Sequence, residues 1–326
     1  MQQARITVLA TGGTIAGVAG SALRHDYRPG QIGIEAFLGQ VAGLGLGLSF
    51  TGTQIANIGS EDITAPVWSR LHAGCLTALA DPDCTAIIIT HGTDTVEETA
   101  FLLDLTLPST KPIVLVGAMR PSDAVGYDGL RNFANAARVA SDPDAAGRGV
   151  LVVMGDNVFA ARDVRKVRTR GSDAFRGFPR GSIALVTPAA LDWFGAPWRI
   201  GAEARFAYRE PLPEVVILPV FAGITPDYVD RLCRPDTRGI VVAGVGEGNT
   251  PEPMRQRLVA AARSGLAVVR ASRTDEGLVD RLPEDDDNGF VAARALSPQK
   301  ARILLQLLIA DGVTDPSAMQ EAFDRR

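Results

Sequence analysis

The chain has 326 residues, of which 46% are hydrophobic and 21% are charged. This composition is typical of a globular protein and excludes a disordered one, and at about 150 residues per domain the length predicts two domains. The formal net charge of -4 argues against nucleic acid as a partner. The apolar runs are too short to span a bilayer, so we expect no membrane partner.

Cysteine and histidine are scarce, with three of each in the chain. Neither CxxC nor HExxH spacing occurs, so we expect no metal and no cofactor. Cys75 and Cys84 could pair, but reduced and packed thiols are the better interpretation. The chain begins in a strand-like segment without an apolar signal region, which predicts a cytoplasmic protein as given. A periplasmic form whose signal has been removed is the alternative.

Short apolar, β-branched runs alternate with helical patterns, which indicates an α/β fold. Continuous apolar runs of this length are typical of strands buried on both faces of a parallel sheet. The predicted strands are 6–9, 86–89, 113–116, 150–153, 215–218, 240–243 and 267–270. The predicted helices are 96–105, 130–140, 253–262 and 298–309.

The alternation is interrupted over 171–213, where Gly, Pro and aromatic residues follow no regular period. A second series of strands and helices begins near Glu214. We therefore predict a larger N-terminal domain over 1–205 and a smaller C-terminal domain over 213–326, both α/β with mainly parallel sheets. Ligands of open α/β sheets bind at the carboxyl ends of the strands, so a site is expected in the turns that follow strands.

The first predicted strand leads into a Gly-rich turn, TGGTIAG, at 11–17. Its spacing fits neither a dinucleotide-binding nor a phosphate-binding loop. One interpretation is a plain turn whose Thr hydroxyls cap a helix. The other is a nucleophile on Thr11 or Thr14, which the glycines let a substrate approach closely. The long loop-like segment that follows carries Tyr27, and loops of this length often form lids.

The turn THGTDT at 90–95 follows the most apolar strand. Thr95 and Glu98 have the spacing of a capping box, and Asp94 favours a helix N-terminus. A helix N-terminus binds anions, and a carboxylate beside it can hold an ammonium. This turn therefore fits a zwitterion such as an amino acid.

Two more turns follow strand-like runs, GSED at 59–62 and GVGEGN at 244–249. Considered alone, the first is a helix cap in which Ser60 or Asp62 begins the helix that runs through Trp68. The second follows the predicted strand 240–243 and belongs to the predicted C-terminal domain.

The basic run ARDVRKVR at 161–168 contains Lys166 in a chain that uses Arg far more often than Lys. A solvated surface segment is one interpretation of this run. A base is the other, because Lys can release its proton and Arg cannot. A Ser-His-Asp triad is disfavoured, since the chain lacks a GxSxG elbow and His91 has a plainer role in a turn.

Taken together, these motifs resemble the bacterial-type L-asparaginase family, most closely its type II asparaginase/glutaminase branch. The combination of TGGTIAG with HGTDTxEET is highly specific to that family. The matches run in order along the whole chain: LATGGTIAG at 9–17, Tyr27 with PGQIG after it, IGSED at 58–62, ITHGTDTVEET at 89–99, KPIVLVGAMRPSDAVGYDG at 111–129, GRGVLVVMGDNVFAARDVRK at 147–166, GVGEGN at 244–249, NGFVAA at 288–293 and SPQKARILLQL at 297–307.

The resemblance implies hydrolysis of L-asparagine to L-aspartate and ammonia, with a side activity on L-glutamine and without metal or cofactor. It also implies a homotetramer that is a dimer of dimers. Each site then lies between the N-terminal domain of one subunit and the C-terminal domain of its neighbour.

The family's catalytic residues match five positions of this chain. Thr14 matches the nucleophile and Tyr27 matches the lid tyrosine, while Thr93, Asp94 and Lys166 match the second catalytic group. Two routes for removing the Thr14 proton stay open, one through Tyr27 and one through Thr93 and Lys166.

The family's substrate-binding residues match a second set of positions. Ser60, Glu61 and Asp94 match the residues that hold the α-carboxylate and the α-ammonium. Ala118 matches a position whose backbone carbonyl meets the side-chain amide. Asn249 matches the residue that a neighbouring subunit contributes.

The chain departs from the family in one segment. The family has a Glu shortly before the GF of the NGFVAA motif, contributed by a neighbouring subunit. Here residues 280–288 read DRLPEDDDN, so Asp280 or Glu284 takes that place, or neither does.

Two other functions are alternatives on the same scaffold. One is the amide-donor deamidating subunit of a tRNA amidotransferase, but that subunit has extra sequence before the nucleophile motif, which starts here at residue 11. The other is a non-catalytic amino-acid sensor, which the intact Thr14, Thr93, Asp94 and Lys166 argue against.

Overall fold

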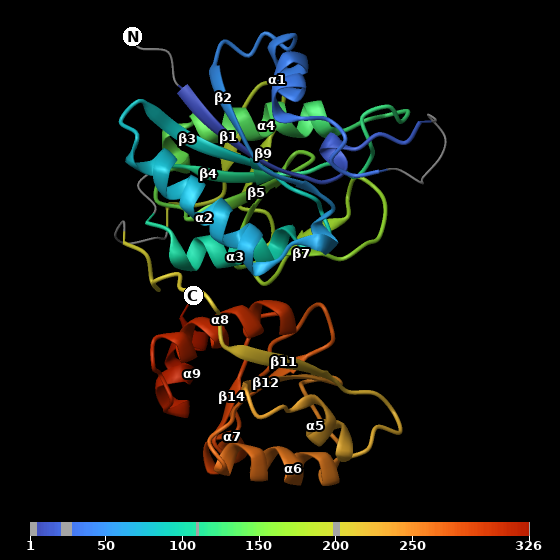
Figure 1. Ribbon diagram of the computed structural model, residues 1–326, viewed down its shortest axis with the longest axis vertical. Coiled ribbons are helices and arrows are strands. Elements are labelled where there is room, and N and C mark those ends of the chain that lie inside the picture. The colour runs from blue at the N-terminus through green and yellow to red at the C-terminus, as the bar shows by residue number, and fades with distance from the viewer. Residues whose placement is uncertain (1–4, 21–27, 109–110, 198–202, 326) are drawn as a thin grey trace. The chain divides into compact units, whose positions relative to one another are not determined.

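A computed structural model describes residues 5–20, 28–108, 111–197 and 203–325 (Figure 1). The chain divides into two units, residues 1–205 and 206–326. Each unit has its own sheet covered by helices, so the predicted α/β class is confirmed. The predicted strands and helices are all present, with ends that differ by up to three residues.

The first unit contains an eight-stranded sheet in the order β10-β9-β6-β5-β4-β3-β1-β2. Its parallel strands are β1 (Arg5–Gly12), β2 (Ser49–Ile58), β3 (Cys84–Thr90), β4 (Ile113–Val116) and β5 (Val150–Met154). Antiparallel strands extend this sheet on one side: β6 (Asn157–Ala160), β9 (Ala184–Val186) and β10 (Leu191–Trp193). A separate antiparallel pair consists of β7 (Val164–Lys166) and β8 (Phe175–Gly177). The segment without a regular period therefore contains short strands.

Helices cover both faces of this sheet (Figure 1). They are α1 (Ile34–Ala42), α2 (Ala65–Ala80), α3 (Val96–Thr106) and α4 (Gly129–Ser141). Strand β3 is buried on both faces: Ile88 belongs to the core with α1 and α4, and Ile87 to the core with α2 and α3. This explains the continuous apolar run of β3, since a central parallel strand has no solvent face.

Two predictions about helix caps are wrong. Helix α3 begins after Thr95, but the Thr95 side chain does not cap it, because its hydroxyl donates to the Ser60 carbonyl at 2.8 Å. Helix α2 begins after Thr64, whereas Ser60 and Asp62 lie in a separate 3₁₀ turn, η2 (Ser60–Asp62). At Thr95 a contact between neighbouring turns replaces the local capping pattern.

The second unit contains a four-stranded, fully parallel sheet in the order β11-β12-β13-β14. Its strands are β11 (Glu214–Pro219), β12 (Thr237–Gly244), β13 (Ala267–Ser272) and β14 (Phe290–Ala292). Its helices are α5 (Asp227–Leu232), α6 (Glu252–Arg263), α7 (Pro283–Asn288), α8 (Pro298–Ala310) and α9 (Pro316–Asp324). Met254 and Leu258 of α6 pack with Val242 and Val268 in one core.

The cysteines Cys75, Cys84 and Cys233 are free thiols, and the first two are buried, as predicted. Burial raises the pKa of the Cys75 thiol, which keeps it protonated and unreactive. Within the described ranges, every helix is too short or too polar to cross a bilayer.

Candidate active site

Six predicted site residues of the first unit, all among the described ones, lie at one edge of its sheet. The parallel strands β4, β3, β1 and β2 are neighbours in the sheet, so the turns at their carboxyl ends are neighbours as well. Four consecutive positions along this edge hold the predicted residues: Ala118 after β4, Thr93 and Asp94 after β3, Thr14 after β1, and Ser60 and Glu61 after β2.

Glycines bring three of these turns into backbone contact. Gly13 has a φ of +80°, and a Cβ at this position would lie 2.4 Å from the Gly92 Cα. A Cβ on Gly92 would in turn lie 2.7 Å from the Ser60 Oγ. Any larger residue at Gly13 or Gly92 would separate the turn of Thr14 from the turns of Thr93 and Ser60. The glycines are therefore required by close approach as well as by backbone conformation.

The turns present buried hydroxyls beside exposed carboxylates. Thr14, Ser60 and Thr93 are at most 5% exposed, whereas the Asp94 side chain is 60% exposed. The Ser60 Oγ accepts the Asp94 N–H at 3.1 Å, which leaves the Ser60 hydroxyl proton available to donate to an anion. This arrangement of donors and carboxylate suits an amino-acid zwitterion.

Lys166 ends strand β7 and joins the two catalytic candidates of the β3 turn. Its Nζ donates to the Thr93 Oγ1 at 2.8 Å and forms an ion pair with the Asp94 carboxylate. Its backbone N–H donates to the Glu97 carboxylate at 2.8 Å. The side chain is 14% exposed, so the ammonium is largely shielded from water, which strengthens both contacts.

His91 stabilises the β3 turn as a neutral imidazole. Its Nδ1 lies 2.7 Å from the Gly92 carbonyl, which can only accept, so Nδ1 carries the proton. Its Nε2 therefore accepts from the Thr99 hydroxyl at 2.9 Å, and Thr99 accepts from the Trp68 indole N–H at 2.9 Å. Burial lowers the pKa of His91 to about 4. This role is structural and leaves no nitrogen for a Ser-His-Asp triad.

The segment that leads towards Tyr27 is anchored at its start, although Tyr27 itself lies outside the described residues. The Gly17 carbonyl accepts the Ser122 N–H at 2.9 Å and the Ser122 hydroxyl at 2.8 Å. The Asp123 carboxylate accepts the N–H groups of Ala19 and Gly20, and these hydrogen bonds lower the pKa of Asp123. These hydrogen bonds therefore fix the backbone that follows Thr14 as far as residue 20.

Asn249 belongs to the second unit, in the turn that follows β12. Its side chain is exposed and shares a cavity of about 110 Å³ with Glu284. Asp280 forms an ion pair with Arg294 at 2.7 Å. Of the two acidic candidates, Glu284 lines a cavity with Asn249, whereas the carboxylate of Asp280 is paired with a guanidinium.

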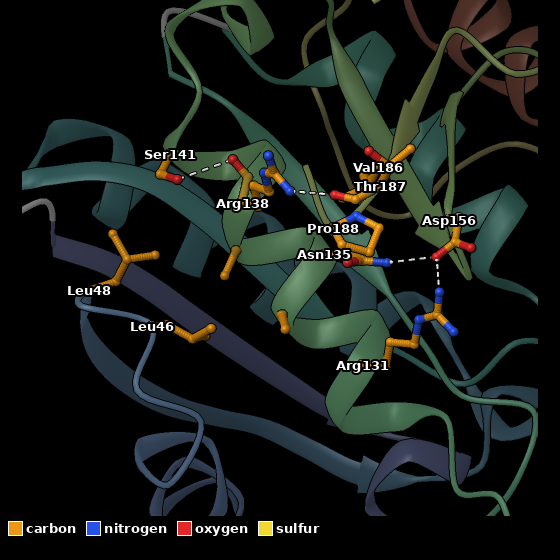
Figure 2. Close-up of a pocket in the computed structure, with 12 residues that line it drawn as sticks. Leu46, Leu48, Arg131, Asn135, Arg138, Ser141, Asp156, Val186, Thr187 and Pro188 are labelled. Carbon is orange, nitrogen blue, oxygen red and sulfur yellow. Dashed lines mark hydrogen bonds and ion pairs between the residues drawn. The ribbon is translucent and has the colours of Figure 1, made fainter. Parts of the chain in front are cut away.

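A larger cavity of about 400 Å³ lies beside α4 in the first unit (Figure 2). Its polar side chains are engaged with one another and with the backbone: Arg131 pairs with Asp156, and Arg138 donates to the Thr187 carbonyl. The predicted site residues that the structure describes lie elsewhere. Among the described residues, no group of three or more His, Cys, Asp or Glu is arranged to hold a metal ion.

Sequence reasoning missed the residues that orient the predicted ones. Glu97 holds the Lys166 backbone across 69 residues, and Thr99 and Trp68 orient His91. The sequence signal for Glu97 and Thr99 was their place within the matched motif ITHGTDTVEET. Their partners are distant in sequence, and no local pattern identifies them.

Comparisons with known proteins find a matching family for each of the two units. The family described as "Asparaginase, N-terminal" matches residues 5–199, and the family described as "Glutaminase/Asparaginase C-terminal domain" matches residues 214–323. Together these matches extend over most of both units.

Several relatives match over nearly the whole chain. "L-asparaginase 2" of Escherichia coli is 40% identical, and the match covers 98% of this chain and 92% of the relative. "Probable L-asparaginase periplasmic" of Haemophilus influenzae is 39% identical with the same coverage, and "Glutaminase-asparaginase" of Pseudomonas fluorescens is 34% identical over 98% and 90%. The crystal structure of a probable cytoplasmic L-asparaginase from Campylobacter jejuni is 35% identical, with a TM-score of 0.92 over 98% and 99% of the two chains.

Proposed function

Because this chain belongs to the asparaginase family, we propose that it hydrolyses L-asparagine to L-aspartate and ammonia through an acyl-threonine intermediate. Relatives that are named glutaminase-asparaginase support a weaker activity on L-glutamine. The observation that carries the proposal is the contact of Lys166 with Thr93 and Asp94, in a turn whose backbone touches the turn of Thr14.

In the first half-reaction the Thr14 oxygen attacks the side-chain amide carbon. The C–N bond breaks, and the proton lost by the hydroxyl is delivered to the leaving nitrogen, which departs as ammonia. A threonine hydroxyl needs a base for this step. Lys166, acting as the neutral amine, accepts this proton through the Thr93 hydroxyl, and the proton then passes to the leaving nitrogen. Asp94 stabilises the ammonium that forms in between. The contact of 2.8 Å between the Lys166 Nζ and the Thr93 Oγ1 supports this route, and Tyr27 is the other candidate base.

In the second half-reaction water attacks the acyl carbon, and the bond to the Thr14 oxygen breaks. The water gives one proton back to the Thr14 oxygen, which restores the hydroxyl and releases aspartate. Backbone N–H groups in the turns after β1 and β3 stabilise the oxyanion of each tetrahedral intermediate. Each such donor contributes about 3–4 kcal/mol in comparable sites.

The substrate is held by its α-carboxylate and α-ammonium. We assign the α-carboxylate to the Ser60 hydroxyl, whose oxygen already accepts the Asp94 N–H. We assign the α-ammonium to Asp94 and Glu61, and the side-chain amide to the Ala118 carbonyl. These groups lie on neighbouring strand ends, which supports their acting on one small ligand.

We further propose that Asn249 acts in the site of a neighbouring subunit, within a homotetramer of two dimers. The first unit then supplies the nucleophile and the lid, and the second unit supplies Asn249. Of the acidic residues in the departing segment, Glu284 is the better candidate for the ammonium, because Asp280 is paired with Arg294.

A coupled ammonia assay on L-asparagine, L-glutamine and their D-forms tests the activity. Rapid acid quenching during turnover, followed by peptide mass spectrometry, tests the intermediate: an aspartyl adduct is expected on the peptide that contains Thr14. Ammonia release from L-asparagine by the purified protein excludes a sensor, and release without an added partner or tRNA argues against an amidotransferase subunit. The names of the relatives reported above favour neither alternative.

A further inference from the structure

The turn that carries Asn249 is held along its backbone by β13 and the residue after it. Its ends pair, with the Asn249 N–H donating to the Val245 carbonyl at 2.8 Å. Three more of its carbonyls accept hydrogen bonds: Gly244 from the Arg273 N–H at 2.9 Å, Gly246 from the Ser272 hydroxyl at 2.5 Å, and Glu247 from the Arg270 guanidinium at 2.5 Å. The position of Asn249 therefore depends on contacts from outside the turn.

Arg270 also packs directly against this turn. Gly248 has a φ of +83°, and a Cβ on it would lie 2.9 Å from the Arg270 Cγ. The stem of Arg270 thus occupies the space that a side chain at position 248 would need, while its guanidinium binds the neighbouring carbonyl of Glu247. Packing connects Arg270 to Gly248, and hydrogen bonding connects it to Glu247, the two residues that precede Asn249.

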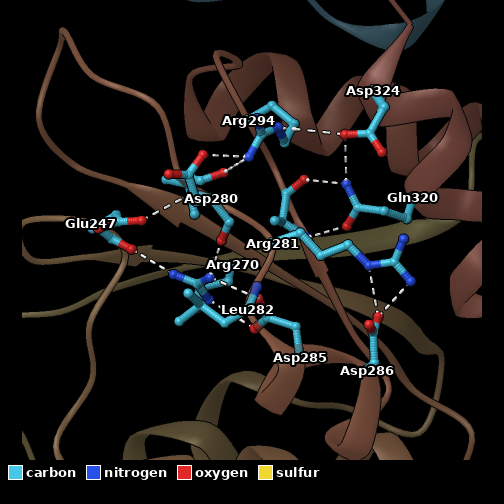
Figure 3. A network of polar contacts seen from close by, with 12 residues as sticks. Glu247, Arg270, Asp280, Arg281, Leu282, Asp285, Asp286, Arg294, Gln320 and Asp324 are labelled. Carbon is cyan, nitrogen blue, oxygen red and sulfur yellow. Dashed lines mark hydrogen bonds and ion pairs between the residues drawn. The ribbon is translucent and has the colours of Figure 1, made fainter.

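The same guanidinium holds the acidic segment 280–285 (Figure 3). It binds the Asp285 carboxylate with two parallel hydrogen bonds of 2.9 and 2.7 Å, and it donates to the Asp280 carbonyl at 2.5 Å. The side chains of Arg270 and Asp285 are 12% and 4% exposed. The Asp285 carboxylate also accepts the Leu282 N–H at 2.8 Å, so the start of α7 is fixed by the same pair.

We propose that Arg270 is a positioning residue that fixes the Asn249 turn and the acidic segment 280–285 as one rigid unit for substrate binding. The inference rests on the proposed function, in which Asn249 serves an asparagine site. Only arginine has the donors for this role: two for the carboxylate and further N–H groups for two carbonyls in different directions. A lysine would retain the charge next to Asp285, but its single ammonium cannot reach both carbonyls and the carboxylate with this geometry.

Kinetics of five variants test whether Arg270 acts through Asn249. R270K and S272A each loosen the turn, and S272A leaves the Arg270–Asp285 pair intact in case R270K folds poorly. We expect R270K to lower kcat/KM for asparagine about ten- to a hundredfold, mainly through KM, and S272A to lower it by less. In the R270K/N249A double variant we expect a smaller further loss relative to N249A than R270K causes in the wild type. The matched control is R257K, because Arg257 pairs with Asp230 in the same unit, outside the turn, and it should have wild-type kinetics.

Additive losses in the double variant, or wild-type kinetics for both R270K and S272A, would overturn the proposal. Hydrogen exchange provides a readout that does not depend on activity. Peptides over 244–250 should exchange faster in R270K and S272A than in R257K, while peptides over β11 stay unchanged. Unchanged exchange over 244–250 would also overturn it. If N249A is as active as the wild type, the turn has no role in substrate binding and the proposed function of Asn249 fails. Hydrogen exchange alone then tests whether Arg270 fixes the turn.

Discussion

Thr14 and Asn249 lie in two Gly-rich turns at the carboxyl ends of parallel strands, and the two turns are held by different chemistry. The Thr14 turn packs through Gly13 against Gly92, which lies in a neighbouring turn stabilised by a neutral, buried His91. The Asn249 turn is held by the charged guanidinium of Arg270. The first arrangement buries its functional hydroxyls, and the second presents an exposed amide. Buried hydroxyls suit covalent chemistry because the surrounding protein fixes the nucleophile in place, and an exposed amide suits a contact with another surface.

The sharpest test of this difference is Thr14→Ala, which should abolish ammonia release while the fold and assembly are retained. Thr14 supplies a covalent bond to the substrate, and no other group in the site replaces its oxygen. The measurement is the coupled ammonia assay with size-exclusion chromatography. Thr14→Ser keeps a hydroxyl and should retain activity. Activity above a few per cent in the Ala variant would remove Thr14 as the nucleophile.

Lys166→Arg should be nearly inactive although the charge is preserved. An arginine cannot exchange its proton near neutral pH, and its planar fork does not reproduce the contact of one nitrogen with Thr93 and Asp94. Steady-state kinetics provide the measurement. Lys111→Arg is the matched control, because Lys111 donates to the Asp81 carbonyl, away from the site. Wild-type rates in Lys166→Arg would limit Lys166 to an electrostatic role.

The two regions should complement each other between subunits. Thr14→Ala and Asn249→Ala are each expected to be impaired, and joint refolding of the two should restore about a quarter of the wild-type activity, the fraction of intact sites in random symmetric dimers. Native mass spectrometry confirms that hybrids have formed. If hybrids form and activity stays at the level of the separate variants, each site is built within one chain.

The anchors of the two regions should differ in pH dependence. Burial lowers the pKa of His91 to about 4. Between pH 6.5 and about 4, the unfolded state therefore binds a proton on this imidazole that the folded state does not bind. The free energy of unfolding should therefore fall between pH 6.5 and about 4, by up to roughly 3 kcal/mol from this group. The second unit contains no histidine, and all tryptophans lie in the first, so tryptophan fluorescence during urea unfolding reports the first unit. His91→Gln should flatten this dependence, and an unchanged slope would contradict the assignment.

The smallest expected effect concerns Glu61, whose carboxylate lies over Gly59, where a Cβ would approach it to 2.4 Å. Glu61→Gln removes a charge-assisted contact to the substrate ammonium, worth about 1 kcal/mol. Because glutamine is one methylene longer than asparagine and places its ammonium differently, the ratio of glutaminase to asparaginase activity should change by a few-fold. The measurement is kcat/KM for both amides from about pH 5 to 9. Glu35→Gln on α1 is the surface control. An unchanged ratio would remove Glu61 from the proposed site.

The sequence by itself determined the α/β class, the extent of the main strands and helices, and the family. These properties follow from local periodicity and from motifs that are continuous in the chain. The buried run of β3 illustrates this, because a strand without a solvent face is apolar at every position. Thr14, Thr93 and Lys166 were identifiable for the same reason, since each lies inside a motif.

Only the tertiary structure decided which groups hold those residues in place. Thr95 has the sequence of a helix cap, yet its hydroxyl binds the Ser60 carbonyl in the turn after another strand. Glu97 binds Lys166 across 69 residues, and Arg270 joins the Asn249 turn to Asp285. A hydrogen bond depends on distance and direction in space, and the order of strands in a sheet sets these for turns that are far apart in the chain. Local sequence patterns carry no information about such pairs.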